Sequence, residues 1–418
     1  MTALASRADV LVLGAGIIGI SAALHLQQRG RSVALVDRRG AAEETSYGNA
    51  GLIQREGVYP YGFPHDYGAL VRYGFNRTID AHYHPSAVAH LAPFLWKYWH
   101  HSRPARHEKI AHVYAHLIEH CVTEHDALAV QADATKFLKR IGWMKVFRTE
   151  RERDLRYREA ERWNKEFALN YRTLDRDALQ EEEPHLSPVL IGGLHWTDPV
   201  CVDDPQGLAL AYLALFEKRG GRYLQGNAAS LVSSSAGWSV RTGDGNVAAR
   251  DAVIALGPWA DTLTNSLGYD LPLAVKRGYH MHYRAAGHAK LNHPVLDHER
   301  GYFLAPMRRG IRLTTGAEFA HRDAIKTPVQ LGRAEPIARD LFPLAERLDT
   351  EPWMGARPCT PDMLPIIGPA PMHKNLWFSF GHAHHGLTLG PVSGRLLAEM
   401  ITGEATVVDP SPYRADRF

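Results

Sequence analysis

The chain has 418 residues, of which 22% are charged, and its formal net charge is +3. A charge so close to balance lacks the basic stripe that nucleic-acid binding needs, so we expect no nucleic-acid partner. The cysteines lie far apart without CxxC or Cys/His spacing, which argues against a disulfide framework, an iron–sulfur cluster or a structural zinc. The length favours two packed domains, and the cysteine usage favours a reducing, cytoplasmic environment.

The longest apolar run, residues 10–24, is shorter than the roughly 20 residues that a membrane span needs and is interrupted by glycines. It therefore predicts neither a transmembrane helix nor a signal peptide. The aromatic stretch APFLWKYW at residues 92–99 could touch a membrane, although a buried helix is the simpler interpretation. We expect membrane contact to be peripheral at most.

The first strand, ADVLVLG, runs directly into a GxGxxG motif formed by Gly14, Gly16 and Gly19. A helical pattern follows, and a second strand, SVALVD, ends on Asp37. In such a unit the first glycine permits the tight turn, the second lets the backbone approach a pyrophosphate, and the third lets helix and strand pack closely. The phosphate lies at the helix N-terminus, and Asp37 accepts hydrogen bonds from a ribose. The unit predicts a bound dinucleotide without separating NAD from FAD.

The next segment, ETSYGNAGLI at residues 44–53, has little helical or strand character. Its hydroxyl, amide and small residues could wrap a flat polar ring, because they offer hydrogen bonds and close backbone approach. A surface loop rich in serine and glycine is an equally open interpretation of the composition.

Residues 80–187 show long helical patterns. In HEKIAHVYAHLIEHCVTEH one apolar face repeats at three- and four-residue spacing, which predicts a packing helix. The histidines of its opposite face, His112, His116 and His120, could be read as a metal-binding row, but no acid or cysteine partner is evident. The charge-rich stretch that follows predicts a solvated helix.

From Gly192 the pattern returns to strands and a helix. Asp204 is placed to cap a helix, and the strand AVIALG, which ends at Gly257, is expected to lie against the nucleotide again. The nucleotide-binding domain is therefore expected to be discontinuous. Beyond it, GYHMHYRA, GYFLAPMRRG and IRLTTGAEF predict antiparallel strands that carry a substrate pocket.

The C-terminal region contains EPWMGARPCTPDMLPIIGPAP and NLWFSFGHAHHGLTLGPVSGRLLAEMITG. Together with GAGIIG and ETSYGNAG, these segments resemble the D-amino-acid oxidase superfamily of FAD-dependent oxidoreductases, most of all the small-chain bacterial D-amino-acid dehydrogenases. The resemblance implies an α/β, Rossmann-like FAD-binding domain of the glutathione-reductase type, formed by residues 1–79, 192–270 and 350–418. It also implies an α+β substrate-binding domain with an antiparallel sheet, formed by residues 80–191 and 271–349.

The same resemblance implies a set of residues around non-covalent FAD, because Cys359 is displaced from the position, here Gly355, at which sarcosine-oxidase-like members attach FAD. The expected pyrophosphate and ribose contacts are Gly14, Gly16, Ile17, Ile18, Gly19, Asp37 and Arg38. The expected flavin contacts are Thr45, Ser46, Asn49, Ala50, Gly51, Leu52, Gly257, Gly381, His382, Gly386, Leu387 and Thr388.

Three residues are implied on the substrate side. Arg357 is expected to pair with a substrate carboxylate, its alternative being an interdomain salt bridge. Tyr302 is expected to face the ligand, with Tyr59, Tyr61 and Tyr279 as rivals. His384 takes a loop position that faces the pocket, and no metal is expected at this histidine cluster because no carboxylate or thiolate completes a site.

The implied reaction oxidises a D-amino acid, or a cyclic or N-substituted amino acid, to the imino acid by hydride transfer from Cα to flavin N5. No catalytic base is assigned, and quinone, another protein or oxygen remain open as electron acceptors. The alternatives are a glycine- or sarcosine-type amine oxidase, an NAD-linked reductase and a non-catalytic flavin-binding scaffold. GHAHHGL and ETSYGNAGL depart from the usual dehydrogenase motifs GHGTLGW and ETSFANAGQ, which puts the usual substrate range in doubt.

Overall fold

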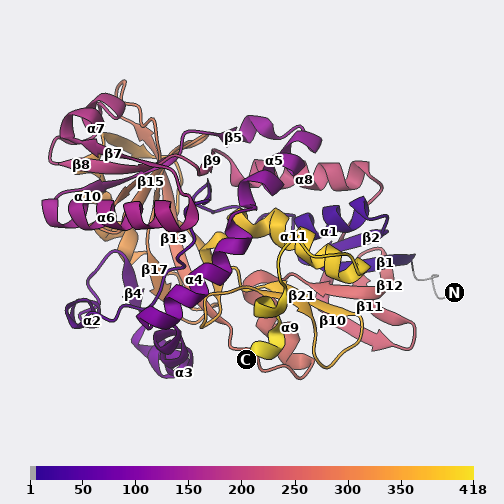
Figure 1. Ribbon diagram of the computed structural model, residues 1–418. Coiled ribbons are helices and arrows are strands. Elements are labelled where there is room, and N and C mark those ends of the chain that lie inside the picture. Colours follow the sequence, from indigo (N-terminus) through magenta and orange to yellow (C-terminus); the bar gives the residue numbers. More distant parts are fainter. Residues whose placement is uncertain (1–5) are drawn as a thin grey trace.

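The computed structural model describes residues 6–418 and arranges them around two large sheets and one short sheet (Figure 1). The first five residues of the predicted segment 1–79 lie outside the described part. The first sheet has the order β1-β2-β10-β11-β12-β21-β20, with β1 also paired to β12. Its strands are β1 (Ser6–Leu13), β2 (Val33–Asp37), β10 (Arg222–Ser234), β11 (Gly237–Thr242), β12 (Gly245–Ile254), β20 (Ile366–Pro369) and β21 (Leu376–Phe380).

The centre of this sheet is parallel, since β1 pairs in parallel with β2 and β12, and β12 pairs in parallel with β21. Alternate residues of β1 enter different cores because successive side chains of a strand point to opposite faces. Val10 and Val12 pack on the side of α1 (Ile17–Gln28). Leu11 and Leu13 pack on the other side, with side chains of the antiparallel strands β10, β11 and β12. The Rossmann-like prediction is confirmed.

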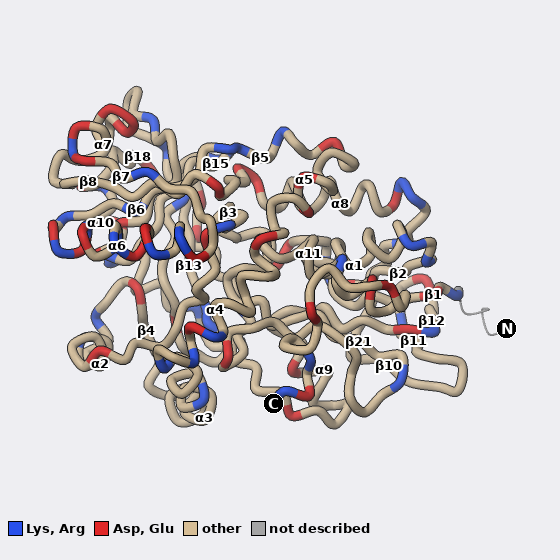
Figure 2. Tube along the Cα trace, in the orientation of Figure 1, with Lys and Arg blue, Asp and Glu red and all other residues tan. Residues whose placement is uncertain are grey.

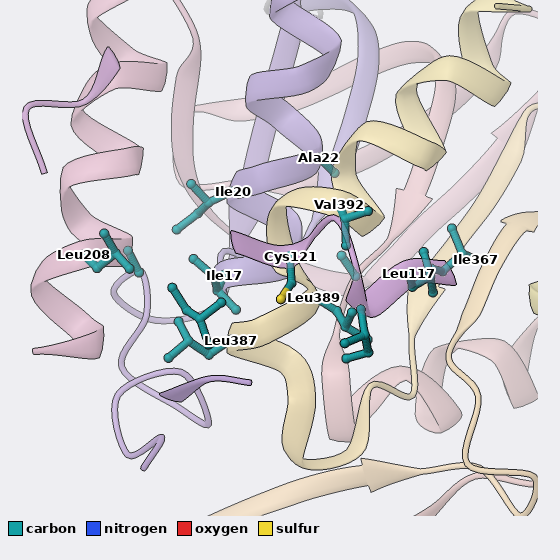
Figure 3. Close-up of a cluster of buried hydrophobic side chains, with 14 of the residues drawn as sticks. Ile17, Ile20, Ala22, Leu117, Cys121, Leu208, Ile367, Leu387, Leu389 and Val392 are labelled. Atoms are coloured by element: carbon teal, nitrogen blue, oxygen red, sulfur yellow. The ribbon is translucent and has the colours of Figure 1, made fainter. Parts of the chain in front are cut away.

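Helices from distant parts of the chain cover one face of this sheet. They are α1, α5 (Cys121–Gln131), α8 (Pro205–Lys218) and α11 (Gly386–Thr402). Figure 3 shows Ile17 of α1 beside Leu387 of α11, in the buried cluster that also holds Ile20, Leu389 and Val392. The contact is close because Gly394 has no side chain: a Cβ there would lie 2.6 Å from the backbone carbon of Ser21.

The second sheet follows the path β4-β17-β13-β16-β15-β14-β6-β8-β7, with β18 and β19 also paired to β13. Its strands are β4 (Ala81–Tyr83), β6 (Trp143–Phe147), β7 (Tyr171–Asp175), β8 (Gly192–Trp196), β13 (Ala274–Ala285), β14 (Val295–Asp297), β15 (Tyr302–Met307), β16 (Gly310–Thr314), β17 (Ala317–Phe319), β18 (Leu344–Arg347) and β19 (Trp353–Cys359). The predicted antiparallel arrangement of β13, β15 and β16 is confirmed.

Helices α6 (Glu150–Phe167), α7 (Arg176–Glu182) and α10 (Val329–Leu341) pack on the second sheet. Figure 2 shows acidic and basic residues alternating along α6, and only Ala160 of that helix is buried, so the predicted solvated helix is confirmed. The short third sheet joins β3 (Leu52–Ile53), β9 (Val200–Val202) and β5 (Leu138–Lys139). The predicted loop at 44–53 therefore ends in a strand.

The structure differs from the expected pattern in the middle of the chain. The single helix expected around residues 107–125 is two helices, α4 (Pro104–Ile118) and α5, which turns to pack on α8 and α11. No glycine or proline marks the break, so the sequence could not reveal it. Strands β4 to β7 also interrupt the region that was expected to be mainly helical.

Two strands pair with a different sheet from the one that the predicted domain borders imply. β8, expected with residues 192–270, pairs with β6 and β7, and β19, expected with residues 350–418, pairs with β13. Both strands are largely buried, which gives them the same apolar pattern as strands of the first sheet. The division into two domains at the predicted borders stays a prediction.

The remaining helices, α2 (Tyr67–Gly74), α3 (Pro85–His101) and α9 (Ala260–Ser266), lie at the periphery (Figure 1). Trp96 of the stretch 92–99 is 66% exposed, whereas Leu91, Phe94 and Tyr98 are buried, so α3 is a packed helix with one exposed aromatic. Within residues 6–418 no helix is both long and apolar enough to cross a membrane.

Candidate active site

A cavity of about 1210 Å³ runs between the two large sheets. Its wall is formed by the glycine turn after β1, the segment at 44–54, the facing strands β13 and β19, and the turn that precedes α11. Ligand pockets usually measure about 300–1,000 Å³. The size is thus suited to a dinucleotide together with a small substrate.

The glycine turn lies at one end of the cavity. Gly14 has φ +106°, and a Cβ there would lie 2.4 Å from the carbonyl oxygen of Ala255, so a side chain is excluded. A Cβ on Gly19 would lie 1.8 Å from the carbonyl oxygen of Gly14, which explains the third glycine. Gly14, Gly16, Ile17 and Ile18 line the cavity, whereas Gly19 serves only the packing of α1 on β1.

Asp37 ends β2 beside this turn. Its carboxylate accepts hydrogen bonds from the backbone N–H of Ala15 at 2.7 Å and of Arg39 at 3.0 Å, which fixes it at the cavity wall. Arg38 pairs with Glu44 at 2.9 Å, and its guanidinium lies 4.3 Å from the ring centroid of Trp259. Gly257, with φ +55°, faces the same end, and no atom lies within 4 Å of a Cβ built there.

The segment at 44–52 crosses from the glycine turn to the middle of the cavity. Ser46 Oγ accepts a hydrogen bond from the N–H of Ile17 at 3.0 Å, and Thr45 Oγ1 donates to the carbonyl of Ala356 at 2.9 Å. Asn49 Oδ1 accepts from the N–H of Gly51 at 2.9 Å. The lining residues of the predicted set here are Thr45, Ser46, Asn49, Ala50 and Leu52. Gly51, at φ +78°, only shapes the turn.

The turn before α11 closes the opposite end. Of the predicted residues, His382, Gly386 and Leu387 line the cavity, while Gly381 and Thr388 do not. His382 contacts Ser393 Oγ at 3.0 Å through Nε2, and burial lowers its pKa to about 3, so the imidazole is neutral. Thr388 accepts from the N–H of Gln54 at 3.1 Å and donates to the carbonyl of Leu52 at 3.2 Å. It therefore joins α11 to β3 without facing the cavity.

These elements fit an FAD molecule. The N-terminus of α1 and the side-chain-free turn at Gly14 and Gly16 suit a diphosphate, and Asp37 suits a ribose. The segment at 45–52, the N-terminus of α11 and Arg357 line the cavity beyond the glycine turn, and these residues would hold the flavin ring and the substrate. The backbone N–H groups at the N-termini of α1 and α11 favour binding of a group that gains negative charge.

Arg357 lies in the cavity wall without an acidic partner. Its guanidinium donates to the carbonyl of Gly316 at 3.0 Å and reaches those of Arg277 and Thr315 at 3.5 Å. Within residues 6–418 no carboxylate forms an ion pair with it, so the interdomain salt bridge considered above is absent from the described chain. Burial lowers its pKa below the usual arginine value, as expected for a cation that lacks a counter-charge.

Lys276 is a second cation in this wall that the sequence did not indicate. It lies opposite Arg357 in the β13–β19 register, and its Nζ lies 3.8 Å from the ring centroid of Tyr98. The sequence shows only that Lys276 belongs to a strand. Which face of the sheet its side chain is on cannot be predicted until the pairing of the strand is known.

His384 lines the cavity, as expected, and its ring centroid lies 4.7 Å from that of Tyr61. Burial lowers its pKa well below the usual histidine value, and the nearby His385, Arg357 and Lys276 lower it further, so His384 is neutral. His385 is buried and contacts the Tyr114 hydroxyl through Nδ1 at 2.7 Å. His384 is therefore the member of the pair that can meet a ligand.

Tyr302 is the predicted residue that suits its role least. It borders the cavity but is 1% exposed, and its hydroxyl donates to Asp297 at 3.1 Å and to the carbonyl of Ile337 at 3.3 Å. The hydroxyl of its rival Tyr279 donates to Glu318 at 3.0 Å. Tyr61, by contrast, is 65% exposed and stands at the cavity. The geometry thus favours Tyr61 as the tyrosine that meets a ligand.

Trp353 is a further lining residue that the sequence did not indicate. Its ring occupies the space of the side chains that Gly48 and Gly355 lack, since a Cβ on either glycine would lie 2.0 Å from it. The ring stacks on His280 at 4.7 Å between centroids. The sequence shows that Trp353 stands two residues before Gly355, in WMG. It does not show that the same ring packs against Gly48 in the segment at 44–53.

A family model described as FAD dependent oxidoreductase matches residues 9–400 of the chain. The chain belongs to this family of FAD-dependent oxidoreductases. Among curated relatives it is 27% identical to a D-amino-acid oxidase of Bradyrhizobium diazoefficiens, with 98% of each chain covered. It is 28% identical to a D-amino acid dehydrogenase of Cereibacter sphaeroides, over 98% of this chain and 95% of the relative.

Solved structures agree on the fold of this FAD-dependent oxidoreductase. Glycine oxidase from Geobacillus kaustophilus superposes with a TM-score of 0.74 at 23% identity, covering 99% of each chain. L-Amino acid deaminase from Proteus vulgaris superposes with a TM-score of 0.75 at 18% identity, covering 100% of this chain and 99% of its own. The fold is thus shared by proteins that are named for different substrates.

Proposed function

We propose that the chain oxidises a D-amino acid, or a cyclic or N-substituted amino acid, to the corresponding imino acid. The observation that carries this proposal is Arg357, a guanidinium in the wall of the FAD cavity whose partners are backbone carbonyls. A substrate carboxylate would supply the missing counter-charge and accept a charge-assisted hydrogen bond from the guanidinium. The names of the curated relatives, a D-amino-acid oxidase and D-amino acid dehydrogenases, support the same class of substrate.

Lys276 extends the anion-binding wall. Because it lies opposite Arg357 in the strand register, one carboxylate can contact both cations, with each oxygen facing one of them. Tyr98, whose ring lies under the ammonium group, limits the freedom of the lysine. This arrangement orients the Cα–H bond of a bound amino acid toward the ring site.

The nitrogen end of the substrate would lie near Tyr61 and His384. Because His384 is neutral, it can accept a hydrogen bond from an amine without placing a positive charge beside it. When bound, FAD supplies the two-electron acceptor for the hydride that leaves the carbon bearing the nitrogen. The chain contributes binding and orientation, and the amine proton leaves to solvent.

FAD is proposed to be held without a covalent bond. The described cysteines, Cys121, Cys201 and Cys359, are all free and buried, and burial raises the pKa of each thiol. A thiol with a raised pKa is a poor nucleophile at neutral pH. Denaturation in acid is expected to release all flavin into the supernatant.

The electron acceptor remains a choice between quinone, another protein and oxygen. Peripheral membrane contact is a proposal as well. Three exposed aromatic side chains support it: Tyr67 of α2, Phe75 directly after α2, and Trp96 of α3. A glycine- or sarcosine-type activity is the second candidate, because the fold matches glycine oxidase. A non-catalytic flavin scaffold would leave the unpaired Arg357 without a purpose.

The test is anaerobic reduction of the purified flavoprotein. D-amino acids, L-amino acids, N-methyl amino acids, glycine and proline derivatives are added singly, and the flavin band is followed. Bleaching by one class supports the proposal and selects the substrate. Arg357→Met should weaken binding of that substrate about 10- to 100-fold, the loss expected for one charge-assisted hydrogen bond. Arg300→Met, at an exposed position outside the cavity, is the control.

Flavin that no amine bleaches would contradict the amine proposal. Bleaching that survives Arg357→Met with unchanged affinity would instead contradict the assignment of the carboxylate site.

A further inference from the structure

A cluster of titratable side chains lies on the second sheet, outside the FAD cavity. Glu182 ends α7, His195 lies on β8, and His293 lies in the connection between β13 and β14. One ligand atom of each residue lies within 4.8 Å of those of the other two. None of the three lines the cavity, so the proposed oxidation does not use them.

His195 points an unprotonated nitrogen into this cluster. Its Nε2 lies 2.8 Å from the carbonyl oxygen of Ile141, which can only accept, so Nε2 carries the hydrogen. The lone pair is therefore on Nδ1, which has no hydrogen-bond partner in the described chain. Its neighbour is Glu182 Oε2 at 3.6 Å, and the histidine side chain is only 8% exposed. His195 Nδ1 is thus a buried acceptor that faces a partly exposed carboxylate, and two acceptors in this arrangement favour a positive centre between them.

His293 is held in the matching tautomer. Its Nδ1 lies 2.8 Å from Glu183 Oε1, a carboxylate acceptor, so Nδ1 donates and Nε2 keeps its lone pair. Glu183 also accepts from the backbone N–H of His293 at 2.6 Å and of Asn292 at 3.0 Å. The histidine is thus positioned by the protein itself. Metal-binding histidines usually donate their second ring N–H to a carboxylate or a backbone carbonyl, and both arrangements occur here.

Glu182 completes the set. Arg172 Nη2 lies 2.7 Å from Glu182 Oε1, so Oε2 is the carboxylate oxygen that faces the histidines. In a tetrahedral zinc site with bonds of about 2.0 Å, ligand atoms are separated by about 3.3 Å. The separation of 3.6 Å between His195 Nδ1 and Glu182 Oε2 is close to that value.

We propose that Glu182, His195 and His293 bind a divalent transition metal of the zinc class. Two imidazoles and one carboxylate are ligands that Zn²⁺ prefers, and a water molecule would complete the four positions. The ion would tie α7, β8 and the β13–β14 connection together, which are separate in sequence. Its role is structural, because no ligand residue reaches the FAD cavity.

A second trio, His82, His84 and Glu318, also brings potential ligand atoms within 4.8 Å. There Glu318 is already neutralised by Arg277 at 2.6 Å and accepts the Thr327 hydroxyl at 2.5 Å. Arg277 is fully buried and therefore disfavours a dication strongly, whereas Arg172 beside Glu182 is 57% exposed and its charge is screened by solvent. The second trio therefore serves as the comparison.

The test measures metal and flavin in the same protein. The flavoprotein is produced with added zinc, passed into metal-free buffer, and analysed for zinc by mass spectrometry and for FAD by absorbance. Wild type and His84→Gln should carry about one Zn²⁺ per chain, whereas His195→Gln and Glu182→Gln should carry almost none. FAD content should be the same in all four proteins.

Wild-type protein alone provides a second readout in case the variants fold poorly. Removal of zinc with a chelator should lower Tm by several degrees, zinc should restore it, and Co²⁺ should produce the ligand-field bands of a tetrahedral site. Wild type that binds neither zinc nor cobalt would overturn the proposal. Zinc content in folded His195→Gln equal to wild type, or lost in His84→Gln instead, would do the same.

Discussion

Lys276 and Arg357 lie directly opposite each other on β13 and β19, so their side chains project from the same face of the sheet. Both line the FAD cavity, and neither forms an ion pair within residues 6–418. Two cations that share a wall repel each other, which raises the free energy of the empty cavity. An anionic group bound between them would remove this cost, so we expect the pair to favour a carboxylate, in line with the proposed function.

Replacing Lys276 tests the shared carboxylate site. Lys276→Met should weaken substrate binding about tenfold, at the lower end of the range for a charge-assisted hydrogen bond, because Arg357 on the facing strand would still contact the carboxylate. The limiting rate of flavin reduction should change less than the affinity. Anaerobic stopped-flow traces at varied substrate concentration separate the two quantities. Lys374→Met, an exposed lysine outside the cavity, is the control, and equal affinities in the two variants would remove Lys276 from the site.

Tyr302 is expected to support the structure and not the reaction. In Tyr302→Phe the hydrogen bond to Asp297 is lost, but Asp297 keeps its ion pair with Arg148 at 2.7 Å. We expect the free energy of unfolding to fall by about 0.5–1.5 kcal/mol, with flavin reduction unchanged. Urea unfolding and stopped-flow reduction check the two statements. A loss of rate of roughly 100-fold, typical of a proton-transfer group, would return Tyr302 to the active site.

The contact between α1 and α11 should not tolerate a methyl group. A Cβ on Gly394 would lie 2.6–2.8 Å from backbone atoms of Ser21 and Ala22, which cannot rotate away. Gly394→Ala should therefore cost about 1–3 kcal/mol of stability and weaken FAD retention. Gly332→Ala is the matched control, since Gly332 is a helical glycine of α10 with no atom within 4 Å of its Cβ position. That change should stabilise by about 0.5–1 kcal/mol, and thermal melts of both variants compare them.

His125 should make stability fall in mild acid. Its Nε2 donates to the carbonyl of Leu387 at 2.7 Å, and burial lowers its pKa from 6.5 to about 4. Above pH 6.5 the residue is neutral in both states. Below it, the unfolded chain gains a proton that the folded chain excludes down to about pH 4, so stability decreases by up to about 1.4 kcal/mol per pH unit across this window.

The pH dependence of unfolding in urea measures this effect. His125→Gln should show a shallower decrease between pH 6.5 and 4 than wild type, even though it is less stable at neutral pH. His288→Gln, an exposed histidine, should keep the wild-type slope. Parallel slopes for wild type and His125→Gln would show that His125 is protonated in the folded chain.

Local motifs made the cofactor half of the site predictable. The turn at Gly14, Gly16 and Gly19 could be read because strand, turn and helix follow one another without interruption, and Asp37 ends the next strand. The glycine at 257 was found by the same reasoning. In each case a backbone conformation demands a residue type within a short stretch, so the sequence carries the signal directly.

The substrate half depends on contacts between distant segments. Lys276 becomes a site residue only when β13 pairs with β19, and Trp353 only when its ring meets Gly48. Tyr302 points into the core because Asp297 draws its hydroxyl there. The trio of Glu182, His195 and His293 spans more than a hundred positions of the chain, so no spacing rule could suggest it. Strand pairing, and not composition, decides these positions.

The packing of α11 on α1 also sets the order in which the molecule can fold. During synthesis the unit formed by residues 6–37 emerges well before residues 386–402, which cover its apolar helix face. Such long-range contacts slow folding and leave apolar surface open in the meantime. The nascent chain therefore holds a nearly complete nucleotide turn that stays uncovered until α11 has been made, and it is at this stage that chaperone binding or early FAD capture would have the greatest effect on yield.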